Sequence, residues 1–433
     1  MSSLTISIIA GGMFLMLLFF GMRIGLALLL SGFAGIAMMR GFGPAMSMLV
    51  FDSWGQAASF SLAVIPMFIL MGNFATRSGV TSDLFAACYK WFGHRKGGLG
   101  YVTIMTSALV NMFCGSATAT TATIGAVCYP EMIKYNHKPL PTAAIIASSS
   151  AYGLLIPPSI GFILYCTITQ LSVGKMFAAG VVPAVIVIIG ACATVFFMAR
   201  RAPQDMPASG EKFTPAEKIK SLKGVAGFAA LVIIMLGGIF KGFFSPSEGG
   251  AIGAAGAFFI MLARKKANPR DVFECLKETG KTTGMIFLIV IGASLFGKML
   301  AMSRIPAMIA GSVAGWGAGF LAIWAVILVW MLLGTAIDTL PLITILTPIF
   351  YPLVLEMGWD PYWFGNIMVM CMLLGLISPP DGVPVYIMAK ISGQPVMKVF
   401  AACVPFFVML FIVMAIMVYF VPLSTWLPAL VGA

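Results

Sequence analysis

Charged side chains are scarce in this sequence. Asp, Glu, Lys and Arg together make up 9% of its 433 residues, whereas a soluble domain carries about 25%. Hydrophobic residues make up 60%. These proportions exclude an ordinary soluble domain and predict a polytopic membrane protein whose outer surface contacts membrane lipid.

Motifs that carry catalysis or bind nucleotides are also missing. The sequence contains no Walker A motif, no HExxH, no GxSxG and no Rossmann fingerprint. Its 2 His residues are isolated, and its 8 Cys residues form no CxxC pair and lie mostly in apolar runs. Such thiols are typical of packing rather than of a metal centre. We therefore expect no enzyme activity, no catalytic residue and no organic cofactor, so that any transport is driven by an ion gradient or by a partner.

Acidic residues are outnumbered, since 14 Asp and Glu stand against 26 Lys and Arg for a formal net charge of +12. In a membrane protein this excess is first a topology signal, and we do not expect nucleic-acid binding. Basic residues cluster at 90–96, 134–138, 200–223 and 264–281, and none lies between Arg304 and Lys390. The positive-inside rule places these clusters in the cytoplasm and the stretch without them largely outside.

Long apolar runs predict the membrane-spanning helices. A span needs about 20 apolar residues, and about 17 can suffice. Eight candidate spans are unbroken, two others are interrupted by adjacent prolines, and two regions are too long to cross the membrane only once. The unbroken candidates are 4–20, 24–39, 55–76, 177–199, 223–241, 247–263, 283–303 and 397–421; the interrupted spans are 142–171 and 361–389; the over-long regions are 100–135 and 316–356.

The two interruptions are nearly the same sequence. GLLIPPS at 153–159 recurs as GLISPPD at 375–381, an offset of 222 residues (375 − 153). A proline inside a helix costs roughly 3 kcal/mol, and no water in the bilayer core satisfies the freed carbonyls. Such breaks persist where they line a cavity, and a matched pair in two halves is the best sequence pointer to a transporter's binding site.

The two over-long regions read as re-entrant helical hairpins. Each has small polar residues at its middle, and both flanks of 100–135 are basic. If 316–356 crossed the membrane once, Lys390 would fall outside, against the positive-inside rule. We therefore predict an all-α membrane protein with two inverted-topology repeats, each with one hairpin and one broken helix. The repeats are 1–200 and 223–433, joined by a cytoplasmic linker at 201–222, and 268–281 reads as a surface helix.

Oxygen-bearing residues at the hairpin tips suggest a cation site. Ser and Thr crowd around 116–123, and a hard cation such as Na⁺ prefers hydroxyl, carboxamide and carbonyl oxygens. The alternative is that these hydroxyls bond back to helix carbonyls or join neighbouring helices. Restarting half-helices offer partly positive N-termini to an anion.

Asp338 is the sharpest single residue, because it lies in an apolar hairpin far from any Lys or Arg in sequence. An ionisable group at such depth costs about 2.5–3.5 kcal/mol on insertion scales and suggests a function. It could ligate a cation or bond a substrate hydroxyl, or it could cap the next helix. Lys298 and Arg304 could neutralise a substrate carboxylate, with Arg304 the better bidentate partner; the alternative for both is snorkelling to the interface.

These motifs together resemble a known family. The Gly-Ser-Ala tip at 115–117, the two Pro-Pro segments, the Gly-Thr-Ala…Asp tip at 334–338 and Ser-Pro-Ser-Glu at 245–248 resemble the large membrane subunit of tripartite ATP-independent periplasmic (TRAP) transporters. The resemblance covers essentially the whole chain. It implies a secondary transporter of the bacterial inner membrane, in which a moving domain with both hairpins and both broken helices carries substrate and Na⁺ by an elevator motion.

The same resemblance implies partners and substrates. A soluble periplasmic binding protein delivers the substrate, and a small four-helix membrane subunit braces the scaffold. Substrates are small organic anions such as C4-dicarboxylates or sialic acid. Because the chain starts at the large subunit's first span, we expect the small subunit to be a separate chain.

Carried over by position, the resemblance also implies sites for Na⁺, the only metal expected, and for the anion. We expect the second sodium site to hold its cation more strongly, because only the second tip carries a carboxylate. The first sodium site would comprise Gly115, Ser116, Ala117, Tyr152, Gly153 and Pro157; the second Gly334, Thr335, Asp338, Gly375, Ser378 and Pro379; and the substrate site Ser116, Ser159, Asp338 and Arg304.

Two alternatives stay open. A stand-alone Na⁺/organic-anion symporter of the same architecture would need no binding protein. An ion-translocating subunit of a larger membrane complex would carry chains of Lys and Glu inside its spans. Only Asp338 is clearly intramembrane here, which disfavours the second alternative.

Overall fold

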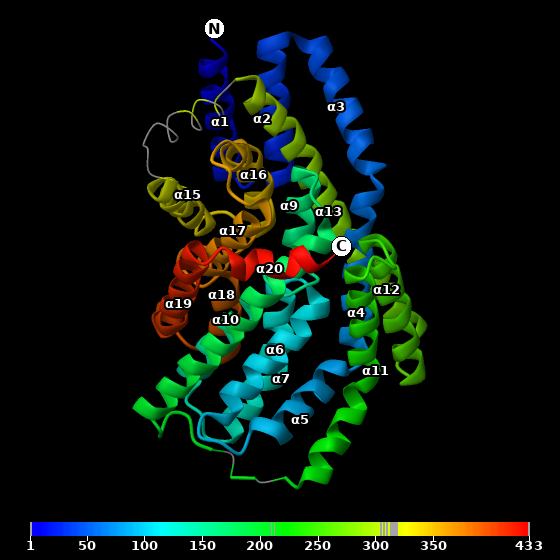
Figure 1. Cartoon of the computed structure of the whole chain (residues 1–433), viewed down its shortest axis with the longest axis vertical. Coiled ribbons are helices and arrows are strands. Elements are labelled where there is room, and N and C mark those ends of the chain that lie inside the picture. Colours follow the sequence, from blue (N-terminus) through cyan, green and yellow to red (C-terminus); the bar gives the residue numbers. More distant parts are fainter. Residues whose placement is uncertain are drawn as a thin grey trace.

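The computed structural model describes residues 2–208, 210–211, 213–303, 305, 308, 311 and 319–431. Throughout these ranges the chain forms helices and connecting turns and no strand, which confirms the predicted all-α class (Figure 1). Seven of the described helices are long and apolar enough to cross a membrane. The helices pack into two groups, which differ in their contacts.

The first group is built around the helix pairs α2–α13 and α4–α12, which pack along one another. Small residues allow the close approach of α2 and α13, because a Cβ added to Gly32 or Gly292 would overlap the backbone of the opposite helix. The group comprises α1 (Ser3–Phe19), α2 (Ile24–Arg40), α3 (Phe42–Ala57), η1 (Phe60–Ala63), α4 (Val64–Arg77), α5 (Val80–Phe92), α11 (Pro215–Phe240), α12 (Pro246–Ala263) and α13 (Pro269–Met302).

The second group surrounds a buried helix, α8, which packs against α6, α7, α18 and α19. It meets the first group mainly where α5 packs on α6 and α13 packs on α16, with a further contact between α4 and α6. The group comprises α6 (Gly98–Cys114), α7 (Ala117–Lys134), α8 (Pro139–Ala151), η2 (Tyr152–Leu154), α9 (Ile160–Thr169), α10 (Val173–Arg201), α15 (Gly319–Gly334), α16 (Thr339–Glu356), α17 (Pro361–Leu376), α18 (Val383–Ser392), α19 (Val396–Tyr419) and α20 (Pro422–Leu430).

Both predicted hairpins and both predicted helix breaks are present. Helices α6 and α7 form one hairpin and α15 and α16 the other, although residues 316–318 of the second lie outside the described residues. The first break separates α8 from α9 and the second separates α17 from α18. Each contains a cis Pro–Pro peptide bond. The repeat boundaries at 200 and 223 remain predictions.

Three details differ from the sequence-based expectation. The surface helix expected at 268–281 and the span at 283–303 are one continuous helix, α13, and no proline separates them. Helix α11 begins at Pro215, inside the expected linker, because Thr214 and Glu217 form a capping box. A further helix, α5, precedes the first hairpin; its charged residues hid it from a search for apolar runs.

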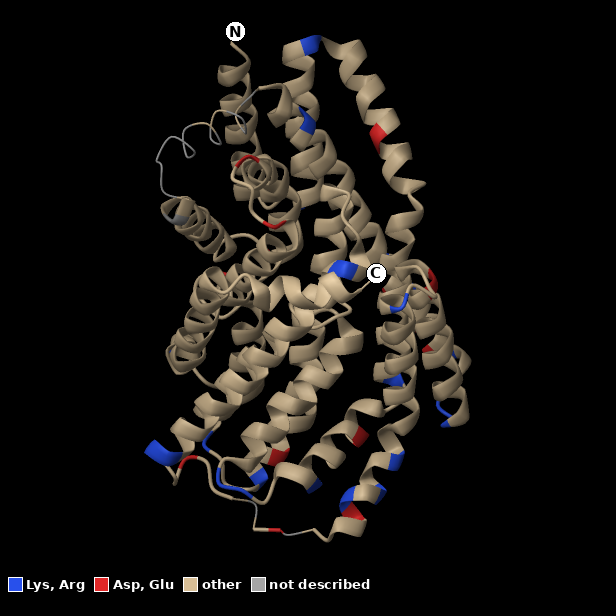
Figure 2. Ribbon diagram, in the orientation of Figure 1, with Lys and Arg blue, Asp and Glu red and all other residues tan. Residues whose placement is uncertain are grey.

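Three of the basic clusters gather at one end of the molecule, around the connections α5–α6, α7–α8 and α10–α11 (Figure 2). These are among the clusters that the positive-inside rule assigns to the cytoplasm. The segment after α10 folds back onto this end. The amide of Lys138 donates to the Asp205 carbonyl at 3.0 Å, and the side chains of these two residues form an ion pair at 2.5 Å.

His137 lies where the segment after α10 contacts the α7–α8 connection, and it is 3% exposed. Its Nε2 lies 3.1 Å from the carbonyl oxygen of Pro207, which can only accept, so Nε2 carries the proton. Nδ1 is buried with no hydrogen-bond partner among the described residues. Burial lowers the pKa of His137 to about 4, because a second proton would place an unpaired charge inside the contact.

This lowered pKa predicts acid sensitivity. The neutral imidazole stabilises the folded state above the unfolded pKa of about 6.5, and this stability is lost as the pH falls toward 4. At a pH of about 5 the loss is about 2 kcal/mol. We expect the thermal midpoint of the purified protein to fall between pH of about 7.5 and about 5, and to fall less in His137→Gln, which keeps a donor but does not titrate. Equal falls in both proteins would contradict this role for His137.

Candidate functional site

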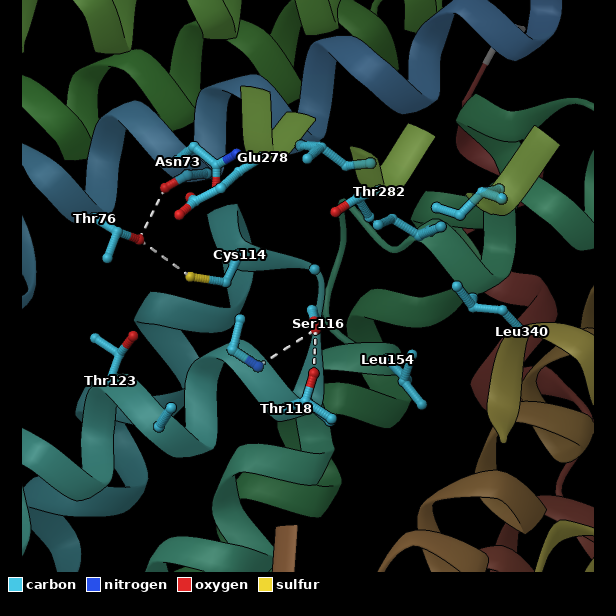
Figure 3. Close-up of a pocket in the computed structure, with 18 of the residues that line it drawn as sticks. Asn73, Thr76, Cys114, Ser116, Thr118, Thr123, Leu154, Glu278, Thr282 and Leu340 are labelled. Atoms are coloured by element: carbon cyan, nitrogen blue, oxygen red, sulfur yellow. Dashed lines mark hydrogen bonds between the residues drawn. The ribbon is translucent and has the colours of Figure 1, made fainter. Parts of the chain in front are cut away.

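A cavity of about 580 Å³ lies between the two hairpin tips and the first helix group (Figure 3). The first tip contributes Ser116 and Thr118, and the second contributes Asp338. Helices α4 and α13 line the opposite side with polar residues. The structure therefore brings together Ser116 and Asp338, which the sequence analysis placed in one substrate site.

The first tip is shaped by a glycine and a capping serine. Gly115 ends α6 in the left-handed region at φ 61°, which favours glycine. Ser116 caps α7: its Oγ accepts from the amide of Ala119 at 3.4 Å and lies 2.9 Å from the Thr118 hydroxyl. The turn thus presents two hydroxyls and the start of a helix to the cavity.

The second tip ends in a carboxylate that caps α16. Asp338 Oδ1 accepts from the amide and the hydroxyl of Thr339, at 2.7 and 3.2 Å. The capping role is therefore present, and the side chain is also exposed to the cavity. The Thr335 hydroxyl donates back to the Leu332 carbonyl at 2.8 Å, so Asp338 is the more available oxygen source at this tip.

Each helix break packs against its own hairpin through a glycine. A Cβ added to Gly153 would overlap the carboxamide of Asn111, and one added to Gly375 would overlap the carbonyl of Gly334. In the second half the amide of Asp381 also donates to the Thr335 carbonyl at 2.9 Å. The structure thus places the two halves of the second expected sodium site side by side, at Gly334 and Gly375, whereas in the first half Gly153 contacts Asn111, one turn before the tip.

Unpartnered buried oxygens gather at the first break. Asn111 Oδ1, Ser150 Oγ and Tyr152 Oη are buried without a hydrogen-bond partner among the described residues. The Asn111 carboxamide reaches the break itself, because its Nδ2 donates to the Ser150 carbonyl at 3.5 Å and its oxygen lies against Gly153. Buried polar atoms are normally satisfied, and these oxygens are ligands that Na⁺ prefers. The residues present therefore fit a sodium ion.

The second break offers fewer free side-chain oxygens. The Ser378 hydroxyl donates to the Leu374 carbonyl at 2.6 Å, and Pro379 is exposed. The other oxygens near the second break are backbone carbonyls and the carboxyls of Asp338 and Asp381, and these two carboxyls interact electrostatically. Stronger cation binding in the second half remains a prediction.

Three other expected residues lie elsewhere. Ser159 is fully buried, caps α9 and donates to the Leu154 carbonyl at 2.5 Å, so it does not line the cavity. Lys298 forms an ion pair with Asp52 of α3. Arg304 lies outside the described residues.

The first helix group contributes polar residues that the sequence analysis missed. Asn73, Thr76 and Arg77 lie on one face of α4, and Glu278 and Thr282 on one face of α13; Figure 3 shows Asn73, Thr76 and Glu278 together. Asn73 Nδ2 donates to Thr279 of α13 at 3.0 Å. In α4 the missed signal was the helical spacing of Asn73 and Thr76 inside a run treated as apolar.

The described residues that line the cavity carry one positive side chain, Arg77, and two negative ones, Glu278 and Asp338. Their formal sum is −1, and so these side chains by themselves disfavour a free anion by simple Coulomb repulsion. A cation bound nearby would remove this repulsion. The electrostatics therefore favour joint binding of a cation and an anion.

Comparisons with known proteins identify the family of the chain. Residues 11–423 match the family model described as "Tripartite ATP-independent periplasmic transporter, DctM component". The chain is 32% identical over 376 residues to the C4-dicarboxylate TRAP transporter large permease protein DctM of Pseudomonas aeruginosa, covering 86% of this chain and 87% of that one. It is 29% identical over 417 residues to the sialic acid TRAP transporter large permease protein SiaM of Vibrio cholerae, covering 96% of each.

The fold is also similar to a solved structure, the YdaH transporter of Alcanivorax borkumensis, whose reported topology is unusual. The TM-score is 0.62 at 14% sequence identity, over 89% of this chain and 88% of that one. Because the family model and the relatives span nearly the whole sequence, this chain belongs to the tripartite ATP-independent periplasmic transporter family as a large permease, a multi-pass protein of the bacterial inner membrane.

Proposed function

We propose that the protein imports a small organic anion together with Na⁺ by an elevator mechanism. The observation that carries this proposal is the cavity at the boundary of the two helix groups, lined by both tips and formally negative. An anion entering it gains from a cation held at a neighbouring tip. Coupling of the two ions then follows from electrostatics.

The division into two helix groups supports the elevator motion. Both hairpins and both breaks belong to the second group, which meets the first mainly along α5–α6 and α13–α16. If the second group slides as a rigid body, both tips and their bound ions move with it past α4 and α13. Discontinuous helices near the bilayer midplane are typical of such transporters.

The substrate class follows from the relatives and the cavity. Relatives transport C4-dicarboxylates, sialic acid and 2,3-diketo-L-gulonate, according to their names. The cavity volume lies within the range of about 300–1,000 Å³ that is typical of small-ligand sites. We therefore place the substrate among small carboxylic acids such as a C4-dicarboxylate or a sialic acid-like sugar acid. A periplasmic binding protein delivers it, and a small four-helix membrane subunit braces the first helix group.

Reconstitution tests this proposal. Proteoliposomes containing the chain and its small subunit are supplied with a panel of organic acids, with and without a Na⁺ gradient and a binding protein. We expect uptake of one acid only when both the Na⁺ gradient and the binding protein are present. Uptake that needs Na⁺ but no binding protein would support the stand-alone symporter, and uptake that ignores the Na⁺ gradient would contradict the coupling.

A further inference from the structure

A charged cluster that links α4 to α13 lies on one side of the cavity. Arg77 Nη1 lies 3.0 Å from Asp271 Oδ1, and Nη2 lies 3.3 Å from Glu278 Oε1. The three side chains are 33%, 41% and 52% exposed, respectively. Arg77 and Glu278 line the cavity, whereas Asp271 does not.

Arg77 is the one Lys or Arg among the described residues lining this cavity. A guanidinium has five N–H donors in a planar fork, and the two contacts with Asp271 and Glu278 use one each. The remaining donors match the two oxygens of a carboxylate. The contact with Glu278 at 3.3 Å is beyond the usual range for an N–H···O bond, so this pair is the weaker of the two.

Stability does not explain the Glu278 pair. An ion pair with half of its carboxylate side chain exposed contributes little to folding. Placing a carboxylate inside an anion's cavity also opposes anion binding. Its position is explained if it neutralises Arg77 when the cavity holds no anion.

Resting on the proposed function, we propose that Arg77 recognises the carboxylate of the transported acid, and that Glu278 competes with it for the guanidinium. An incoming carboxylate replaces Glu278 at Nη2, while Asp271 holds the guanidinium in place from outside the cavity. Release follows when Glu278 re-forms its pair. The first helix group thereby takes a direct part in substrate selection, alongside Ser116 and Asp338 of the tips.

Direct binding tests this assignment without relying on uptake. The probe is radiolabelled succinate, a C4-dicarboxylate, titrated onto the purified chain in NaCl. We expect Arg77→Gln to raise the Kd at least about 10-fold and Arg77→Lys to give an intermediate value, because a point charge replaces a bidentate fork. Glu278→Gln should lower the Kd about threefold, because it removes the competitor.

A matched control separates recognition from structure. Arg264 forms a comparable pair with Asp83 at 2.6 Å, outside the cavity, and joins α12 to α5. Arg264→Gln should lower the thermal midpoint but leave the Kd within about twofold of wild type. Arg77→Gln with an unchanged Kd, or Glu278→Gln weakening binding as much as Arg77→Gln, would overturn the proposal. Failure of Na⁺-dependent uptake by wild type would instead count against the proposed function.

Discussion

Replacing Asp338 with alanine is expected to reduce Na⁺-driven uptake about 100-fold, which corresponds to the loss of a charge-assisted interaction of about 2–3 kcal/mol. Asp338 is exposed to the cavity at the second tip, and its carboxylate is the strongest oxygen ligand there. The measurement is the initial uptake rate in proteoliposomes, with membrane insertion checked in parallel. Full uptake by a normally inserted Asp338→Ala variant would remove this residue from the site.

Because Asp338 also caps α16, the charge and the cap must be separated. Asparagine is as good an N-cap as aspartate, so Asp338→Asn keeps the helix start and removes only the charge. We expect Asp338→Asn to lose nearly as much uptake as Asp338→Ala while keeping a wild-type thermal midpoint. If Asp338→Asn transports normally, the residue acts through the cap alone.

Replacing Asn111 with leucine is expected to raise the Na⁺ concentration for half-maximal uptake about 10-fold, or about 1.4 kcal/mol, with a smaller effect on the maximal rate. Leucine keeps the branched shape of the side chain, although it is larger, and removes Oδ1, the buried oxygen that has no hydrogen-bond partner among the described residues and lies against Gly153. The measurement is the Na⁺ activation curve at saturating acid.

Asn366 offers a matched control for Asn111. It is a buried asparagine of α17 whose Oδ1 also has no hydrogen-bond partner among the described residues, and its Nδ2 donates to the Ala179 carbonyl at 2.9 Å. Asn366→Leu should destabilise the protein without moving the Na⁺ activation curve. Equal shifts in the two variants would mean that the effect reports general loosening of the second group rather than a cation site.

Local signals made the hairpins and breaks predictable. Adjacent prolines interrupt a helix wherever they occur, and Gly115 is placed at a tip by its positive φ, which other residues rarely adopt. These features depend on a few neighbouring residues. Their pairing into two matched sets was visible because the same short sequence occurs twice.

The other side of the cavity depends on contacts between distant segments. Arg77 and Glu278 are 201 residues apart, and they meet only because α4 packs against α13. Neither residue stood out in its own segment, since one lies just past an expected apolar span and the other in an expected surface helix. Asp338 was identifiable alone because no charge surrounds it in the sequence.

Ser159 shows the limit of comparing two similar motifs. It occupies the position of Asp381 in the repeated segment, and the family resemblance placed it in the substrate site. In the fold its hydroxyl turns back to the Leu154 carbonyl, and the first break is buried throughout. Pro379 of the second break is exposed instead. Similar local sequence therefore produces a backbone break in both halves but does not determine how exposed the residues of the break are.

The segment after α10, which folds back onto the second helix group, limits how far the two helix groups can move relative to each other. Pro207 is held to the second group by His137, and α11 of the first group begins at Pro215. Eight Cα-to-Cα steps join these two points, and a fully extended chain spans at most about 3.5 Å per step, or about 28 Å in all. This tether sets the maximum separation of its two anchors during a transport cycle, and an elevator stroke that needs more must first release the contact around His137.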